Sequence, residues 1–145
     1  TAGDGNLTLT GTSWSLTIPG GNAITTEGAY AVTATVTDAA GNSTSDATTN
    51  ELTIDTTAPA TAPTVVSQTT NDTTPTITGT ATVGAGETLT VTVNGVSYTA
   101  GDGNLTLTGT SWSLTIPGGN AITTEGAYAV TATVTDAAGN STSDA

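Results

Sequence analysis

The sequence contains no lysine, arginine or histidine, and its acidic residues give a formal charge of −12 at pH 7. Protein contacts to nucleic-acid phosphates rely on lysine and arginine, so composition excludes nucleic-acid binding. The same lack argues against contact with an anionic membrane surface. It also leaves no histidine or lysine to activate a serine nucleophile, so we expect no enzymatic activity.

Cysteine is absent as well, which excludes disulfides, thiolate zinc sites and thiol redox chemistry. No apolar run approaches the roughly 18 residues that a membrane span needs. A small extracellular β domain without disulfides usually needs another means of stabilisation, and bound metal is one. Because the acids lack cationic partners, the expected metal is Ca²⁺, a hard cation that takes oxygen ligands.

What the sequence does contain is a long repeat. Residues 1–47 and 99–145 are identical, so the repeat period is 98 residues (99 minus 1). This period is too long for ankyrin, leucine-rich or propeller-blade units. It is about the size of one immunoglobulin-like sandwich. The predicted fold class is therefore all-β: an immunoglobulin-like β-sandwich in tandem repeat, with about one domain per 98 residues.

Alternation of apolar and polar residues predicts the strands. In the second copy we expect them at 65–66, 76–81, 88–93, 96–99, 104–108, 111–116 and 127–135, with a last strand visible only in the first copy, at 48–55. The predicted core-facing residues of three strands are Leu89, Val91, Val93, Trp112, Leu114, Ile116, Tyr128, Val130, Ala132 and Val134. The domain prediction is the C-terminal half of one repeat at 1–54, a linker at 55–62, and a second repeat lacking its last strand at 63–145.

The first half-repeat lacks the strands that should cover its apolar side chains, such as Trp14 and Leu16. Residues 63–98 could supply them only if the linker ran back along the whole sandwich. Eight residues reach at most ~26–29 Å, which barely suffices. We therefore predict that strands completing 1–54 come from outside this chain, and that neighbouring identical repeats are its partners in tandem.

The run GTSWSLTIP…EGAYAVTATVTDAAGNSTS, with DTTAPATAPTVV and TTPTITGTA, resembles bacterial Ig-like tandem repeats. It is most similar to the calcium-dependent extender repeats of RTX-type surface adhesins, over essentially the whole chain. The resemblance implies a secreted, cell-surface spacer that projects an adhesive tip, serves adhesion and biofilm formation, and is rigidified by Ca²⁺ at domain junctions. The sequence departs from that family in having no ligand-binding tip, membrane anchor or glycine-rich β-roll.

The acids can be sorted by the two poles of an Ig-like sandwich. The B–C and F–G loops lie at the pole where the chain enters, and the A–B, C–D and E–F loops lie at the opposite pole. At the first pole we place Glu87, Asp136 and Asp144 of the second copy and Asp38 and Asp46 of the first. At the opposite pole we place Asp72, Asp102, Glu125, Asp4 and Glu27, with Glu51 late in the last strand and Asp55 in the linker.

Seven of these acids should meet at the junction between the two domains: Asp4, Glu27, Glu51, Asp55, Glu87, Asp136 and Asp144. Carboxylates this close would repel one another, and Ca²⁺ needs about six to eight oxygens. The sequence thus predicts calcium at the junction, with the other five acids as further candidate ligands. The alternative for each single acid is a turn former whose carboxylate bonds its own backbone.

Trp14 and Trp112 could stack on sugars, but their alternation with Leu and Ile favours the core. Tyr30 and Tyr128 open a strand as the tyrosine corner of Ig domains does. A rival function is a carbohydrate- or ice-binding module of a secreted protein, and regularly spaced Thr rows beside aromatics on one flat face would favour it. A glycosidase accessory domain is a third possibility, which a neighbouring catalytic domain would reveal.

Overall fold

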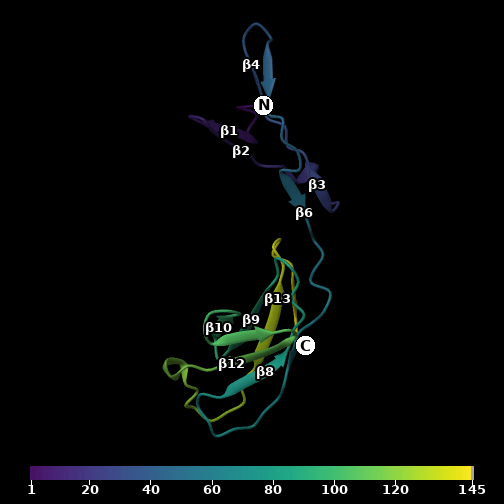
Figure 1. Ribbon diagram of the computed structural model, residues 1–145. Coiled ribbons are helices and arrows are strands. Elements are labelled where there is room, and N and C mark those ends of the chain that lie inside the picture. Colours follow the sequence, from purple (N-terminus) through teal and green to yellow (C-terminus); the bar gives the residue numbers. More distant parts are fainter. Residues whose placement is uncertain (145) are drawn as a thin grey trace. The chain divides into compact units, whose positions relative to one another are not determined.

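The computed structural model describes residues 1–144, and the chain divides into two compact units, Thr1–Asp55 (unit 1) and Thr56–Ala145 (unit 2) (Figure 1). Its regular structure over residues 1–144 is β-strand, apart from two 3₁₀ turns, η1 (Gly20–Asn22) and η2 (Gly118–Asn120). The predicted all-β class is confirmed.

Unit 2 contains two four-stranded antiparallel sheets. One has the order β10 (Val96–Thr99), β9 (Thr88–Val93), β13 (Val130–Thr135) and β14 (Ser141–Ser143). The other has the order β11 (Leu105–Thr108), β12 (Ser111–Thr115), β8 (Thr76–Thr80) and β7 (Thr64–Val65). Consecutive strands β8 and β9 lie in different sheets, as do β12 and β13, which is the connectivity of an Ig-like sandwich.

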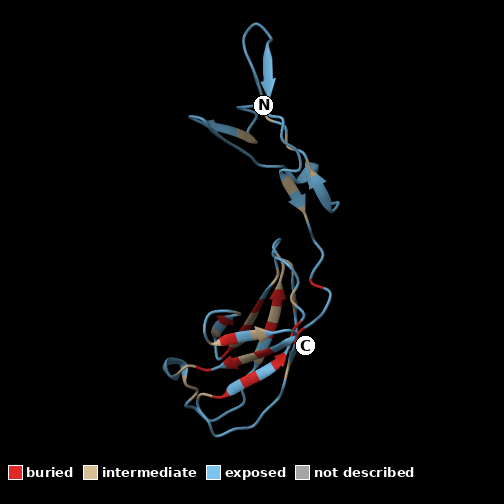
Figure 2. Ribbon diagram, in the orientation of Figure 1, coloured by how far each residue is buried: buried red, intermediate tan, exposed pale blue. Residues whose placement is uncertain are grey.

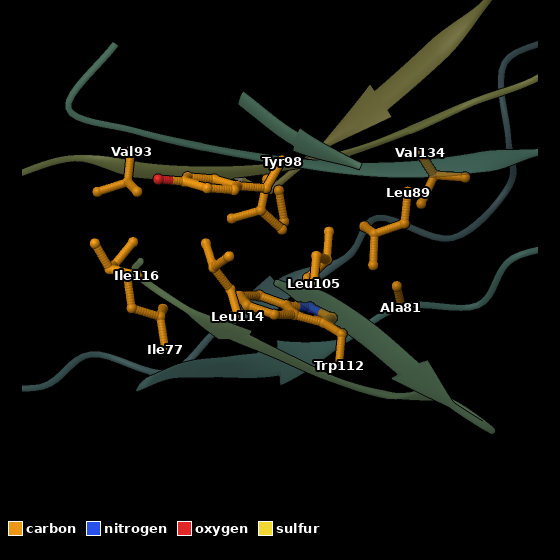
Figure 3. Packing of buried hydrophobic residues seen from close by; sticks show 12 residues of the cluster. Ile77, Ala81, Leu89, Val93, Tyr98, Leu105, Trp112, Leu114, Ile116 and Val134 are labelled. Atoms are coloured by element: carbon orange, nitrogen blue, oxygen red, sulfur yellow. The ribbon is translucent and has the colours of Figure 1, made fainter. Parts of the chain in front are cut away.

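The core of unit 2 forms because each strand alternates threonine or serine outward with an apolar residue inward. The inward residues of the two sheets face each other (Figure 3). The buried cluster is Ile77, Ala81, Leu89, Val91, Val93, Tyr98, Leu105, Trp112, Leu114, Ile116, Ala132 and Val134. Eight of the ten core residues predicted from alternation are in this cluster, and Val130 packs against it, half-buried.

Trp112 is the largest side chain of this core and is 2% exposed. It pairs with Gly79 on β8, and its indole Nε1 donates a hydrogen bond to the Thr64 carbonyl at 3.1 Å. A Cβ atom at position 79 would lie 2.5 Å from the indole ring and 1.9 Å from that carbonyl oxygen. Position 79 therefore requires glycine. Trp112, on β12, contacts both β8 and β7.

Unit 1 has three two-stranded sheets and no buried residue among residues 1–55 (Figure 2). They are β1 (Leu7–Thr10) with β2 (Ser13–Leu16), β3 (Gly28–Tyr30) with β6 (Leu52–Ile54), and β4 (Thr35–Thr37) with β5 (Ser43–Ser45). Completion of unit 1 from outside the chain stays a prediction.

Two details differ from expectation. The last strand begins directly after the F–G turn, as β5 and β14, so unit 2 does contain its first part. Strand β13 begins at Val130 rather than at 127, and Tyr128 is 36% exposed, so its predicted place in the core is wrong. The equivalent Tyr30 lies in β3 because β6 pairs with it, whereas residues 126–128 have no strand partner among the described residues.

Part of the predicted linker packs on unit 2. Pro59 is buried, and its carbonyl accepts a hydrogen bond of 2.6 Å from the Thr142 hydroxyl on β14. Pro63, four residues later, is buried too. The chain is thus fastened to the sandwich before its first strand starts.

Candidate functional site

The F–G turn of unit 2 is organised around Asp136. Its Oδ1 accepts hydrogen bonds from the backbone N–H groups of Ala138 and Asn140, both at 2.9 Å, and its Oδ2 accepts one from Asn140 Nδ2 at 2.9 Å. Gly139, at φ +95°, takes the left-handed conformation that closes the turn. The side-chain amide of Asn140, helped by backbone amides, lowers the pKa of Asp136 from its ordinary value of 3.8.

Asp38 builds the same turn in unit 1, with bonds from Ala40 N, Asn42 N and Asn42 Nδ2 at 2.8–2.9 Å. The pKa of Asp38 is lowered by the same causes, the Asn42 side chain first. Both carboxylates therefore accept hydrogen bonds from residues of their own turns. This is the role of turn former, which was the alternative to a role as metal ligand.

Asp102 organises the connection between β10 and β11. Its carboxylate accepts bonds from the amides of Asn104 at 2.7 Å, Leu105 at 2.8 Å and Thr99 at 3.1 Å. These amides, Leu105 first, lower the pKa of Asp102. In unit 1, Asp4 accepts equivalent bonds from Asn6 and Leu7.

The predicted place of Asp102 in a loop at the opposite pole is wrong. On one side of Asp102, Ala100 N donates to Leu89 O at the start of β9; on the other, Asn104 O accepts from Thr115 N at the end of β12. The connection therefore leaves one sheet beside the start of β9 and enters the other sheet beside the end of β12. Asp102 lies at the edge of the sandwich, where the chain changes sheets.

Glu87 and Asp72 lie in the loops predicted for them. In the B–C loop, a Glu87 carboxylate oxygen accepts a bond of 2.7 Å from Gly84 N. In the A–B loop, Asp72 Oδ1 accepts bonds from Thr74 N at 2.8 Å and from the Thr74 hydroxyl at 3.1 Å. Both acids again bond the backbone of their own loops.

Asp144 is not in the F–G loop, contrary to prediction. Opposite residues of an antiparallel ladder can exchange two N–H···O=C bonds. Asp144 N donates to Ala132 O at 3.1 Å, but Ala132 N donates to the side chain of Asp144, at 2.7 Å. The carboxylate thus replaces a backbone carbonyl beside the middle of β13, where the last strand leaves the regular ladder.

In unit 1 a carboxylate replaces a backbone carbonyl as hydrogen-bond acceptor at two positions. Asp46 accepts a bond of 3.0 Å from Ala34 N, and a Glu51 carboxylate oxygen accepts one of 2.9 Å from Val32 N. The Val32 amide is the main cause that lowers the pKa of Glu51. Sequence reasoning missed this role, because only the pairing register shows which amide an acid faces.

Three acids remain. Glu125 lies exposed in the connection between η2 and β13, Glu27 directly precedes β3, and Asp55 follows β6. The predicted grouping of these three acids at one pole and the linker stays a prediction.

Within residues 1–144, the structure contains no group of three or more acidic side chains that could hold a metal ion. The trio predicted for one pole of unit 2, Glu87, Asp136 and Asp144, is therefore not such a group. The predicted junction set combines residues of both units, and calcium at the junction stays a prediction.

The outward faces of unit 2 carry rows of hydroxyl groups. One row follows the register across the β10-β9-β13-β14 sheet, through Thr99, Thr90, Thr133 and Ser143. Neighbouring hydroxyls bond one another, as Thr133 and Ser143 do at 2.8 Å. The aromatic side chains of these sheets, Trp112 and Tyr98, lie in the core rather than beside the rows.

The tyrosine-corner prediction is confirmed in both copies. The Tyr128 hydroxyl donates to the Thr124 carbonyl at 2.8 Å, and Tyr30 donates to Thr26 at 2.7 Å. This bond to the backbone a few residues upstream is the mark of the motif in Ig-like sandwiches.

Comparison with known proteins adds one finding. A family model described as a bacterial Ig-like domain matches residues 60–145, which include all strands of both four-stranded sheets. No curated protein matches the chain. None of the described residues belongs to a helix long and apolar enough to cross a membrane.

Proposed function

Because the chain belongs to the family of bacterial Ig-like domains, we propose that it is a structural spacer repeat of a large bacterial cell-surface adhesin, serving adhesion and biofilm formation. Domains of this family have a non-catalytic structural fold and are usually extracellular or on the cell surface. The observation that carries the proposal is the identity of residues 1–47 and 99–145, at a spacing equal to one sandwich. A module repeated without change adds reach rather than a new recognition surface.

The second part of the proposal is that Ca²⁺ stiffens the junctions between repeats. It is supported by the charge of −12 without a basic side chain. A carboxylate offers about four lone-pair sites, so bonds to backbone amides leave room for a cation.

Thermal unfolding tests calcium binding directly. Binding to the native state alone adds RT ln(1 + [L]/Kd), about 2.7 kcal/mol at a hundredfold excess over Kd. Extracellular calcium modules have a Kd of roughly 10⁻⁴–10⁻³ M, so millimolar Ca²⁺ is the relevant range. We expect EDTA to lower the Tm, Ca²⁺ to restore it, and Mg²⁺ not to. A Tm indifferent to EDTA would contradict the calcium proposal.

Small-angle scattering tests stiffness separately. We expect the maximum dimension of a chain of several repeats to shrink on chelation, because a short linker alone does not fix an interdomain angle. Asp55→Ala, in the linker, should remove this response, and Asp72→Ala, in the A–B loop, should leave it intact. If both variants respond as the unchanged chain does, Asp55 does not hold the ion.

The hydroxyl rows favour one rival function, binding to carbohydrate or ice. It would appear as retention on an insoluble polysaccharide or as inhibition of ice growth. Thr90→Asp, which puts a charge in the middle of a row, should then abolish the activity. We favour the spacer because these hydroxyls pair with one another and Trp112 and Tyr98 face the core.

A further inference from the structure

The turn between β9 and β10 consists of two residues, Asn94 and Gly95. Both have a positive φ, 50° for Asn94 and 76° for Gly95, as a type I′ hairpin turn requires. Both residues are exposed, and a Cβ atom added at Gly95 would meet nothing within 4 Å. The turn therefore projects into solvent, where its side chain and its backbone are open to reaction.

An asparagine followed by glycine can react with its own backbone. The backbone nitrogen of the following residue attacks the side-chain carbonyl carbon, and a five-membered succinimide ring forms. Glycine is the most favourable following residue, because it has no Cβ to hinder the attack. Asn94 is the only one of the nine asparagines in the sequence that precedes a glycine.

The fold leaves both reacting groups of this turn available. Within the described part of the chain, no hydrogen bond engages the Asn94 side chain or the Gly95 N–H. At Asn104 the situation is the opposite, because the nitrogen that would attack, that of Leu105, donates to Asp102 at 2.8 Å. Ring closure at Asn104 would first have to break this bond, and the leucine side chain would hinder it.

The aspartate of an Asp–Gly pair could form the same ring, and Asp102 precedes Gly103. Closure at an aspartate must expel water from the neutral acid, whereas an aspartate is ionised at neutral pH. The Asp102 carboxylate also accepts hydrogen bonds from backbone amides on both sides of it, at 2.7–3.1 Å. The reactive position is therefore the turn between β9 and β10.

We propose that Asn94 is a site of spontaneous modification, at which the chain converts itself through a succinimide to aspartate and isoaspartate. The Gly95 nitrogen forms a bond to Cγ of Asn94, the bond from Cγ to the side-chain nitrogen breaks, and ammonia leaves with the hydrogen of the Gly95 N–H. Water then opens the ring. Attack at Cγ gives aspartate, and attack at the main-chain carbonyl carbon gives isoaspartate.

Isoaspartate at position 94 changes the hairpin as well as its charge. The backbone then runs through the side chain, which adds one carbon to a turn whose two residues match the twist of the strands. The pair Val93–Val96 closes this turn, and β10 has a strand partner, β9, on one edge only. Isoaspartate should therefore weaken the pairing of an edge strand that contributes Tyr98 to the core.

The test incubates the full chain at alkaline pH, which speeds ring closure because the attacking nitrogen must lose its proton. Mass spectrometry of the chymotryptic peptide that ends at Tyr98 follows the site. We expect Asn94 to lose its amide before any other asparagine, and the product to accept a methyl group from an isoaspartate methyltransferase. Asn94→Gly, which keeps a sequence suited to the type I′ turn, should abolish the early release of ammonia.

Hydrogen exchange measures the consequence for the fold. In the converted chain the amides of β10 should exchange faster, and those of β12, in the other sheet, should be unchanged. The proposal is overturned if Asn94 keeps its amide while other asparagines lose theirs, or if Asn94→Gly releases ammonia as fast as the unchanged chain. Unchanged exchange in β10 after conversion would overturn the effect on the hairpin.

Discussion

Residues 1–47 and 99–145 have one sequence and two environments. In unit 2, Trp112, Leu114 and Val134 are at most 2% exposed, whereas Trp14, Leu16 and Val36 in unit 1 are at least 49% exposed. The hairpin register, the aspartate-centred turns and the tyrosine corners are nevertheless the same in both. Local sequence therefore determines the turns and hairpins, and strands β7–β10 determine whether the apolar side chains are buried.

The largest expected difference between the copies lies in the tryptophans. Trp112→Ala should destabilise unit 2 by about 3–5 kcal/mol, because it leaves a cavity in a filled core. Trp14→Ala removes an exposed side chain and should change stability by no more than about 0.5 kcal/mol. Urea unfolding followed by circular dichroism measures both. Equal effects would mean that unit 1 has a core of its own.

A smaller difference concerns the segment that leads into unit 2. Thr142→Val removes the hydroxyl that bonds Pro59 and keeps the side-chain shape, so it should cost about 0.5–1.5 kcal/mol. Thr44→Val makes the same change at the identical position of unit 1, where the side chain is exposed, and should have no measurable effect. Matched thermal melts of the two variants make the comparison. A neutral Thr142→Val would show that Pro59 is held by packing alone.

The smallest difference should be found in the turns. Asp38 and Asp136 have the same hydrogen bonds, so NMR titration should give both a pKa below 3.8. A depressed folded-state pKa contributes stability that is fully present well above 3.8 and is lost as pH falls through the folded value. Unit 2 should therefore lose stability in acid, and Asp136→Ala should make that loss shallower. An ordinary pKa for Asp136 alone would show that the two turns differ.

Much of the fold could be predicted from the sequence because its signals are local. The alternation in TLTVTV and SWSLT predicted which side chains of β9 and β12 are buried, and the repeat period predicted the size of the sandwich. Tyr98 and Leu105 belong to the core as well, on the predicted strands 96–99 and 104–108, whose inward residues had not been assigned. The crossing between these two strands, from one sheet to the other, depends on tertiary packing and leaves no periodic pattern.

The candidate site was less predictable, because the hydrogen bonds of some of its acids depend on the register of strand pairing rather than on residue type. Asp144 looked like a loop acid because SerThrSer before it carries no apolar signal for a strand. Its bond to Ala132 N follows from the pairing register of the β13–β14 hairpin, in which the two residues are 12 positions apart. Asp136 could be predicted as a turn former, since the AspAlaAlaGlyAsn turn is closed entirely by its own residues.

The most direct test of the claim that β7–β10 alone decide burial is acrylamide quenching of two single-tryptophan chains. Trp14→Phe leaves only Trp112, and Trp112→Phe leaves only Trp14. We expect Trp112 to be strongly protected and Trp14 to be readily quenched, in line with exposures of 2% and 49%. Equal protection of the two tryptophans would contradict the account, because identical sequences would then be buried without the covering strands.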